Sequence, residues 1–205
     1  GTLLSDKSLG YTWAVNAREN KLTPWNNDTM LDNQGEMLIL HLKGKYYNLT
    51  NGAAVTFSPG QAVYRGKAGT ISFIITVSVE QNSVVKNVSV SLMNSGAKPE
   101  TIEIAYYTEP ILGVDRTNAK YLISEIEENM LMLHNCFSQS IPSGMGISAG
   151  TEGRFVCSRT AFWSGRWNDC SDLPAYDPCG AMIIKKELPP AREETVKFIL
   201  GFSAS

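Results

Sequence analysis

Residues 70–80 read TISFIITVSVE, and this stretch decides the fold. Apolar side chains occupy every second position and alternate with threonine, serine and glutamate, with Ile74 as the one break in the series. A period of two is typical of a strand that buries one face and exposes the other. The stretch therefore predicts a half-buried strand in an antiparallel sheet.

Two further runs continue the same alternation along the chain. The first spans residues 84–92, after the polar residues 81–83. The second spans residues 102–106, after the turn-forming residues 95–99. Three alternating runs with short polar connections predict an antiparallel meander within one large sheet.

The flanking sequence supplies more strand candidates than helix candidates. Residues 118–133 could be taken for an amphipathic helix, but their β-branched content and the turn pair Glu128-Asn129 favour a hairpin. Gly44 offers a tight reversal, and residues 188–194 predict a last hairpin. The weaker strand candidates are Leu9–Val15, Glu36–Leu42, Lys45–Leu49, Tyr121–Ile126, Met130–Phe137, Phe155–Phe162, Ala181–Leu188 and Thr195–Phe202.

These patterns predict a single all-β domain over residues 1–205. The sequence contains no internal repeat, low-complexity tract or domain linker. The number of strand candidates is too high for one immunoglobulin-like sandwich. A chain of this length buries about 70% of the surface that its unfolded form exposes, so it can fold without a metal or a disulfide.

Composition excludes several classes of function. The apolar fraction of 43% and the charged fraction of 19% are ordinary for a globular protein. A net charge of −2 argues against a nucleic-acid partner, because surfaces that bind phosphate backbones carry a basic excess. No apolar run is long enough for a membrane helix, and the first ten residues lack the features of a signal peptide. We expect a cytoplasmic protein, with membrane association open to a larger parent protein.

Cysteine and histidine spacing gives no metal site. The four cysteines include no C-x-x-C pair, and the two histidines are far apart in the sequence. Zinc sites need closely spaced thiolates or imidazoles, so we expect no metal. Two disulfides are allowed by parity, but nothing marks secretion, and we expect free thiols that pack as small apolar groups. The residues concerned are Cys136, Cys157, Cys170, Cys179, His41 and His134.

We expect no catalytic residue in this chain. Both histidines lie in apolar strand candidates, and two histidines without a G-x-S-x-G motif do not indicate a triad. A glycosidase needs two carboxyl groups at a fixed separation in space, which sequence spacing does not supply. The carboxylates that could be drawn on are Glu19, Asp28, Glu36, Glu109 and Asp115.

Residues 11–28 are the strongest candidate for a binding segment. They carry two tryptophans, charges of both signs and several amides within eighteen residues. Sugar sites use flat aromatic faces for the C–H side of a pyranose ring and planar polar groups for its hydroxyls. The alternative, which residue chemistry alone favours, is a structural loop in which Arg18 and Glu19 pair internally. The candidate substrate-binding residues are Arg18, Glu19, Asn20, Lys21, Trp25 and Asn26.

Residues 155–169 form a second polar and aromatic cluster. Arg159 and Arg166 accompany two tryptophans, Trp163 and Trp167, and this composition resembles that of surfaces facing sugar or phosphate. The alternative is a connection between strands that is anchored by its aromatic side chains. We favour this structural interpretation.

Several runs carry a resemblance to a known family. Residues 10–13 (GYTW), residues 18–28 (RENKLTPWNND) and the pair Gly35-Glu36 are similar to glycoside hydrolase family ninety-four. That family holds the inverting cellobiose and chitobiose phosphorylases and the C-terminal region of cyclic β-1,2-glucan synthases. The eleven-residue run most resembles the glucan-synthase branch. Shorter similarities follow in family order at residues 94–96, 107–113, 177–181 and 198–201.

The resemblance implies a two-layer antiparallel β supersandwich of the galactose mutarotase-like type. It also implies that this chain is a fragment of a larger enzyme, in which an (α/α)₆ barrel with the general acid would follow Ser205. In such an enzyme inorganic phosphate is a co-substrate, and no cofactor is needed. The implied partners are a β-glucan oligosaccharide, the barrel of the same chain and a second copy in a homodimer. The domain itself would support the barrel and shape its sugar site.

Two departures from the family pattern concern the substrate. The common R-H-G-x-G stretch is Arg65-Gly66-Lys67-Ala68-Gly69 here, without histidine, and residues 29–36 replace the P-V-S-D-P-P-G-E pattern of glucan synthases. The linkage that the parent enzyme recognises is therefore open. The alternatives are a freestanding carbohydrate-binding module and a mutarotase-like enzyme on the same fold.

Overall fold

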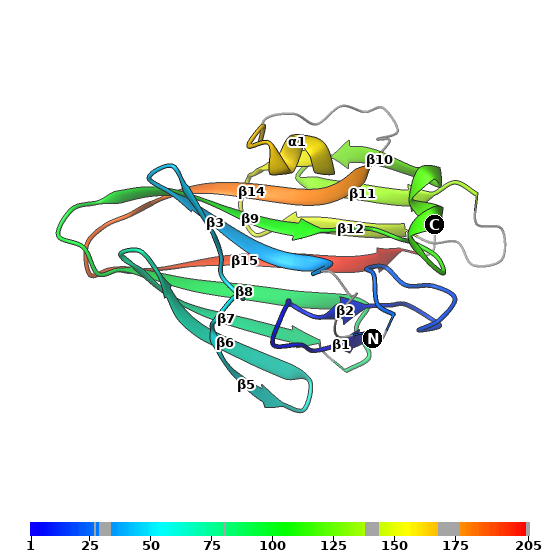
Figure 1. The fold of residues 1–205 in the computed structure, drawn as a ribbon, viewed down its shortest axis with the longest axis horizontal. Coiled ribbons are helices and arrows are strands. Elements are labelled where there is room, and N and C mark those ends of the chain that lie inside the picture. Colours follow the sequence, from blue (N-terminus) through cyan, green and yellow to red (C-terminus); the bar gives the residue numbers. More distant parts are fainter. Residues whose placement is uncertain (27, 29–33, 80, 138–143, 168–176, 204–205) are drawn as a thin grey trace.

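A computed structural model describes residues 1–26, 28, 34–79, 81–137, 144–167 and 177–203. Two antiparallel sheets face each other as separate layers, and a short pair of strands lies beside them (Figure 1). The prediction of an all-β, two-layer domain is confirmed. In the part of the chain that the structure describes, no helix has the length and apolarity needed to cross a bilayer.

The larger sheet has eight strands in the order β10-β11-β12-β15-β8-β7-β6-β5, from the top to the bottom of Figure 1. Every neighbouring pair in it is antiparallel. Its strands are β5 (Ala54–Ser58), β6 (Gln61–Ala68), β7 (Ile71–Val79), β8 (Val85–Asn94), β10 (Leu122–Glu127), β11 (Met130–Asn135), β12 (Gly144–Ala149) and β15 (Glu193–Ser203).

The smaller sheet has five strands in the order β13-β14-β9-β3-β4. The one α-helix among the described residues packs on β13 and β14, outside this sheet (Figure 1). The remaining elements are β1 (Thr2–Leu3), β2 (Tyr11–Thr12), β3 (Glu36–Leu42), β4 (Lys45–Asn48), β9 (Glu100–Thr108), the 3₁₀ helix η1 (Arg116–Tyr121), β13 (Arg154–Ser158), α1 (Arg159–Trp163) and β14 (Pro178–Leu188).

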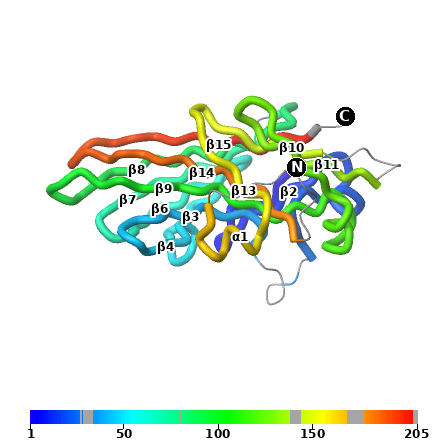
Figure 2. The backbone as a smooth tube through the Cα atoms, turned by 90° about the horizontal axis from the view of Figure 1, so that it is seen from above, coloured from blue at the N-terminus to red at the C-terminus, as the bar shows by residue number. Residues whose placement is uncertain are grey.

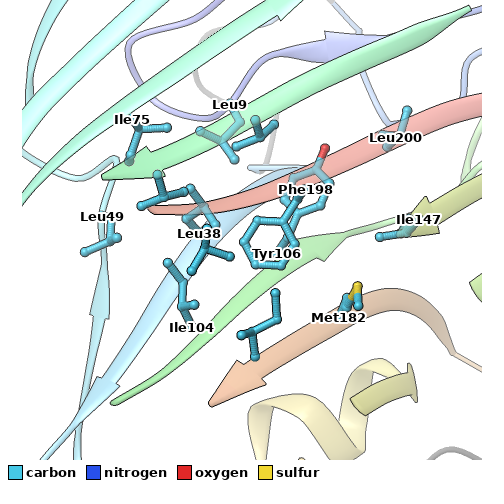
Figure 3. Close-up of a cluster of buried hydrophobic side chains, with 14 of the residues drawn as sticks. Leu9, Leu38, Leu49, Ile75, Ile104, Tyr106, Ile147, Met182, Phe198 and Leu200 are labelled. Carbon is cyan, nitrogen blue, oxygen red and sulfur yellow. The ribbon is translucent and has the colours of Figure 1, made fainter. Parts of the chain in front are cut away.

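The main hydrophobic core lies between the two sheets. Ile75 of β7 and Phe198 of β15 meet Leu38 of β3 and Tyr106 of β9 across the gap (Figure 3). The alternation that predicts the strand at residues 71–79 therefore reflects one face turned to this core and one turned to solvent. A second, smaller cluster of buried side chains lies between α1 and the outer face of the five-stranded sheet.

Two connections that were expected to be hairpin turns cross between the sheets. Residues 95–99 lead from β8 of the larger sheet to β9 of the smaller one, and residues 189–192 lead from β14 back to β15. The predicted three-strand meander is therefore wrong in its third strand, and the predicted last hairpin is wrong. Alternation shows which side chains face the interior, but both sheets have an interior face, so the pattern is the same in either.

Asn94 joins the two crossings at the same end of the sandwich. Its side-chain amide donates to the carbonyl of Lys98 at 2.8 Å and to that of Leu188 at 3.0 Å. Its backbone carbonyl accepts from the N–H of Ala191 at 2.9 Å. One side chain thus satisfies backbone groups of both connections.

Local predictions have mixed outcomes. The strand Glu36–Leu42 and the reversal at Gly44 are confirmed, and residues 122–135 form the expected hairpin. The strand predicted for Phe155–Phe162 ends at Ser158, whose hydroxyl accepts the N–H of Ala161 at 3.3 Å and caps α1. The candidate Leu9–Val15 is a strand only at Tyr11–Thr12.

Some features lie outside the predictions. Strands β5, β6 and β12 were not expected, because β6 places small side chains at Ala62 and Ala68 in its inward series and β12 contains two glycines. Cys136 and Cys179 are free thiols, whereas Cys157 is disulfide-bonded, so the expectation of free thiols is wrong for that residue.

A buried ion pair connects the two sheets. The Oε2 atom of Glu36 accepts from Nζ of Lys86 at 2.6 Å and from the hydroxyl of Tyr106 at 2.9 Å. Its Oε1 atom accepts from the hydroxyls of Thr12 at 2.6 Å and Thr23 at 2.8 Å. The side chains of Glu36 and Lys86 are 0% and 1% exposed, so neither charge has access to water. Both carboxylate oxygens are fully hydrogen-bonded, as a buried charge requires.

The pair ties the N-terminal segment to both sheets. Glu36 begins β3, Lys86 lies on β8, and the Lys86 ammonium also donates to the carbonyl of Leu9 at 2.7 Å. Burial lowers the pKa of Lys86, and the Glu36 carboxylate opposes that shift. Burial and the Glu36 charge raise the pKa of Tyr106, which keeps its proton as a donor. Both charges occupy inward positions, in line with the core residues Leu38 of β3 and Val88 of β8, where apolar side chains are usual.

The Lys86→Met substitution should lower the free energy of unfolding by about 3–5 kcal/mol, because it leaves the Glu36 carboxylate buried without its counter-ion. Urea denaturation followed by tryptophan fluorescence measures this. The double variant Glu36→Gln/Lys86→Met should be more stable than Lys86→Met, since no isolated charge remains. Lys197→Met, at an exposed position of β15, is the matched control and should change stability by about 0.5 kcal/mol or less. A loss below about 1 kcal/mol in Lys86→Met would contradict the role of the pair.

Candidate functional site

The tip of the loop formed by residues 11–28 projects two charged side chains. The Oδ1 atom of Asn16 accepts the backbone N–H groups of Arg18 at 2.8 Å and Glu19 at 3.0 Å, which closes a tight turn. Nε of Arg18 is 3.6 Å from Oε1 of Glu19, and their side chains are 87% and 52% exposed. The internal pairing expected of a structural loop is therefore present, but it leaves both groups accessible.

The base of the loop is held by backbone hydrogen bonds. Lys21 exchanges two of them with Gly113, at 2.9 and 3.2 Å, and the N–H of Ile111 donates to the carbonyl of Leu22 at 2.9 Å. The N–H of Thr12 donates to the hydroxyl of Thr23 at 2.9 Å. The loop is thus a fixed platform for its tip, because Lys21 and Leu22 are bonded to residues 111–113 and the two sides of the loop are bonded to each other through Thr12 and Thr23.

The six predicted site residues do not form one surface. Arg18, Glu19 and Asn26 are exposed, and Lys21 is half-buried. Trp25 is also half-buried and packs at a tilt on Tyr11, with ring centroids 6.3 Å apart. Asn20 is 1% exposed, so it supports the loop from inside and has no face toward a ligand.

The segments that carry the family resemblance meet around Glu36. Residues 10–13 and 22–23 supply its hydroxyl partners, and the carbonyl of Gly35 accepts the N–H of Glu109 at 2.8 Å. A methyl group at Gly35 would lie 2.6 Å from Cδ of Pro24, so this close approach requires glycine. The runs at residues 18–28 and 107–113 are joined by the backbone bonds of Leu22 and Lys21.

A second charged group surrounds Glu109, just after the end of β9. Its carboxylate accepts from the hydroxyl of Tyr107 at 3.2 Å and pairs with the guanidinium groups of Arg116 and Arg159. Nε of Arg159 also donates to Oδ2 of Asp177 at 2.9 Å. Two carboxylates and two guanidinium groups thus converge at the end of the five-stranded sheet.

The pKa values of this group follow from its contacts. Burial and the Glu109 charge raise the pKa of Tyr107 well above its usual value, so its hydroxyl stays protonated and donates to that carboxylate. The hydrogen bond to Asp177 raises the pKa of Arg159. Tyr107 and Arg159 therefore both keep their protons and act as hydrogen-bond donors to the carboxylates beside them.

The two tryptophans of residues 155–169 have different roles. Trp167 is 5% exposed, stacks on Phe162 with centroids 5.2 Å apart, and donates from Nε1 to the carbonyl of Phe162 at 3.1 Å. It is the structural anchor that we expected. Trp163 is 54% exposed, and its Nε1 donates to the hydroxyl of Tyr107 at 3.3 Å. Arg166 is exposed and donates to the hydroxyl of Ser164 at 3.1 Å.

An open depression lies between α1 and β4. Its volume is about 620 Å³, and it is lined by residues of β3, β4 and α1 together with Gln34, Asn51 and Glu109. None of the six residues predicted from the loop lines it. Sequence reasoning missed it because its lining comes from segments far apart in the chain. The available signal was the polar and aromatic cluster at residues 155–169, of which Arg159 and Trp163 line the depression.

The histidines do not form an acid–base pair around an open site. Nδ1 of His41 is 3.1 Å from Oε2 of Glu103, and the His41 ring stacks on Tyr46 with centroids 4.5 Å apart. Although partial burial acts in the opposite direction, the bond from His41 and the charge of Arg154 hold the pKa of Glu103 below its usual range. His134 lies on β11 of the other sheet. Within the described ranges, no three or more metal-ligating acidic, cysteine or histidine side chains are grouped.

Sequence comparison with known proteins identifies a family and a distant relative. The family model described as "Glycosyl hydrolase 94, supersandwich domain" matches residues 1–205. The cyclic beta-(1,2)-glucan synthase NdvB of Rhizobium meliloti (strain 1021) is 24% identical over 238 residues. That alignment covers 98% of this chain but 8% of the synthase, so the chain corresponds to a small part of its relative.

Solved structures share the fold at low sequence identity. A protein assigned as a kojibiose phosphorylase from the human microbiome has a TM-score of 0.51 and 10% identity, over 94% of this chain and 25% of that chain. A protein assigned as an aldose 1-epimerase from Escherichia coli K12 has a TM-score of 0.51 and 9% identity, over 90% of this chain and 89% of that chain. These likenesses show the fold alone. Because the family model matches its whole length, this chain belongs to the glycosyl hydrolase 94 supersandwich family.

Proposed function

We propose that this chain is a non-catalytic domain of a larger carbohydrate-active enzyme that acts on β-glucans. In this role it supports the catalytic barrel and places its loop of residues 11–28 against the sugar site of that barrel. Family membership and the 8% share of the glucan synthase that the chain matches support this proposal. The parent enzyme would use inorganic phosphate or a second sugar as acceptor. In a homodimer, the loop of one copy would lie against the other copy.

The observation that carries the proposal is the contrast between the base and the tip of the loop. The base is fixed by the bonds of Lys21 and Leu22 to residues 111–113, and by the hydroxyls of Thr12 and Thr23 on the buried Glu36. The tip presents a guanidinium group and a carboxylate to the surroundings. A fixed base with an exposed polar tip is a preorganised contact, because the loop loses little freedom when a partner or ligand binds.

In the parent enzyme, Arg18→Ala should lower kcat/KM for the β-glucan substrate about tenfold, which is the loss expected for one hydrogen bond to a charged group. Steady-state kinetics and the Tm of the same preparation test this together. Arg65→Ala, at an exposed position of β6, is the matched control and should leave both unchanged. A variant with altered Tm and unchanged turnover would instead show that the loop is purely structural.

A mutarotase-like activity is the alternative that the fold raises, since the aldose 1-epimerase likeness covers most of both chains. Ring opening of a sugar needs an acid and a base on opposite sides of the reacting atoms. The His41 imidazole and the Glu103 carboxylate are hydrogen-bonded directly to each other, and Tyr46 covers one face of the His41 ring. This arrangement leaves no space for a sugar between them.

We therefore expect the chain to leave the rate of glucose mutarotation unchanged. Polarimetry of freshly dissolved α-glucose at pH 7 measures the rate, with an aldose 1-epimerase as the positive control. An acceleration that disappears in His41→Asn would overturn the assignment of the domain as non-catalytic.

A further inference from the structure

We propose that the depression between α1 and β4 is a second carbohydrate site, which binds a short neutral β-glucan oligosaccharide. The residues of the depression decide the place of this site. The choice of a glucan rests on the proposed function. The loop of residues 11–28 takes no part in it, because none of its residues lines the depression.

The strand order gives the depression a floor and two walls. β3 lies between β9 and β4 in the five-stranded sheet, and its outward residues Met37 and Ile39 form the floor. Trp163 of α1 stands on one side, and Tyr46 of β4 stands on the other; Figure 2 shows α1 and β4 along the same face. The volume of about 620 Å³ is within the range of small-molecule sites, roughly 300–1,000 Å³.

Trp163 offers an aromatic face that is both exposed and fixed. Its indole N–H is bonded to the Tyr107 hydroxyl, and its ring lies at 59° to that of Tyr107 and at 89° to that of Phe162. More than half of the residue is nevertheless open to solvent. A pyranose ring has an apolar C–H face, and a tryptophan held in place can cover that face without losing further side-chain freedom.

The polar groups around the floor are held in position by one another. Nδ2 of Asn48 donates to Oε1 of Gln34 at 2.6 Å, and Nε2 of Gln34 donates to Oδ1 of Asn51 at 3.1 Å. Arg159 is held by Asp177 and Glu109. Amide and guanidinium groups are planar donors and acceptors suited to pairs of hydroxyls, and here they need no rearrangement to meet a sugar.

The balance of charge favours a neutral ligand over phosphate. Glu109 and Asp177 carry two negative charges, and Arg116 and Arg159 carry two positive charges in direct contact with them. A phosphate group would have to displace a carboxylate from these guanidinium groups. A neutral sugar can accept or donate hydrogen bonds at the same edge and leave the ion pairs intact.

The test is calorimetric titration of the chain with β-1,2-linked glucose oligosaccharides of three to five units. We expect saturable binding with a Kd of about 1 mM or tighter. Trp163→Ala should weaken it at least about tenfold, and Trp163→Phe should restore part of the loss because an aromatic face returns. If Trp163→Ala lowers the Tm, Tyr46→Ala tests the site in its place, and it should also weaken binding.

Two controls separate this site from other surfaces. Phe57→Ala removes an aromatic side chain of similar exposure from β5 of the other sheet, and it should not change the affinity. Inorganic phosphate at the same concentrations should neither bind nor compete with the oligosaccharide.

The possible failures are distinguishable. Absence of oligosaccharide binding up to about 10 mM would overturn the second site and leave the proposed function of the loop untouched. Binding that is lost in Arg18→Ala but kept in Trp163→Ala and Tyr46→Ala would also overturn it, and would place the sugar at the loop. Competition by phosphate would show that the depression is an anion site.

Discussion

The fold depends on one constraint, which is that the carboxylate of Glu36 must be neutralised without water. Lys86 reaches it from the opposite sheet, and hydroxyls from the N-terminal segment complete its hydrogen bonds. An ion pair of this kind contributes little net stability, but a conformation that lacked one partner would leave a bare charge in the core. The pair therefore selects one arrangement of β3, β8 and the N-terminal segment over other packings with similar apolar burial.

Both candidate sites are fixed by this arrangement. Leu22 and Lys21 join the loop to residues 111–113, and Gly35 joins the start of β3 to Glu109. Glu109 in turn positions the guanidinium groups at the depression. Backbone hydrogen bonds thus hold the base of the loop, and side-chain contacts of Glu109 and Tyr107 hold Arg159 and Trp163 of α1. Neither site depends on a segment that has to fold when a ligand arrives.

Alternation was enough to predict the fold class and the strand at residues 71–79, because burial on one face imposes a period of two. It could not assign β9 or β15 to a sheet, since an inward side chain has the same character in both layers. The family resemblance directed attention to residues 18–26, of which the structure leaves Arg18, Glu19 and Asn26 exposed. The cluster at residues 155–169 drew attention to Arg159 and Trp163, but the rest of the depression comes from residues 34–51 and Glu109, which the sequence alone does not bring together.

The place of β15 has a consequence for how the protein is made. It is the last strand of the described chain, yet it lies inside the eight-stranded sheet, hydrogen-bonded to β12 on one side and to β8 on the other. Until β15 is in place, β5–β8 and β10–β12 are not joined, and the edges of β8 and β12 that will pair with it are unpaired. An unpaired edge can hydrogen-bond to another chain, and strand pairings between residues distant in sequence form slowly. A chain in which β15 has not yet paired therefore exposes the inner edges of β8 and β12 to aggregation.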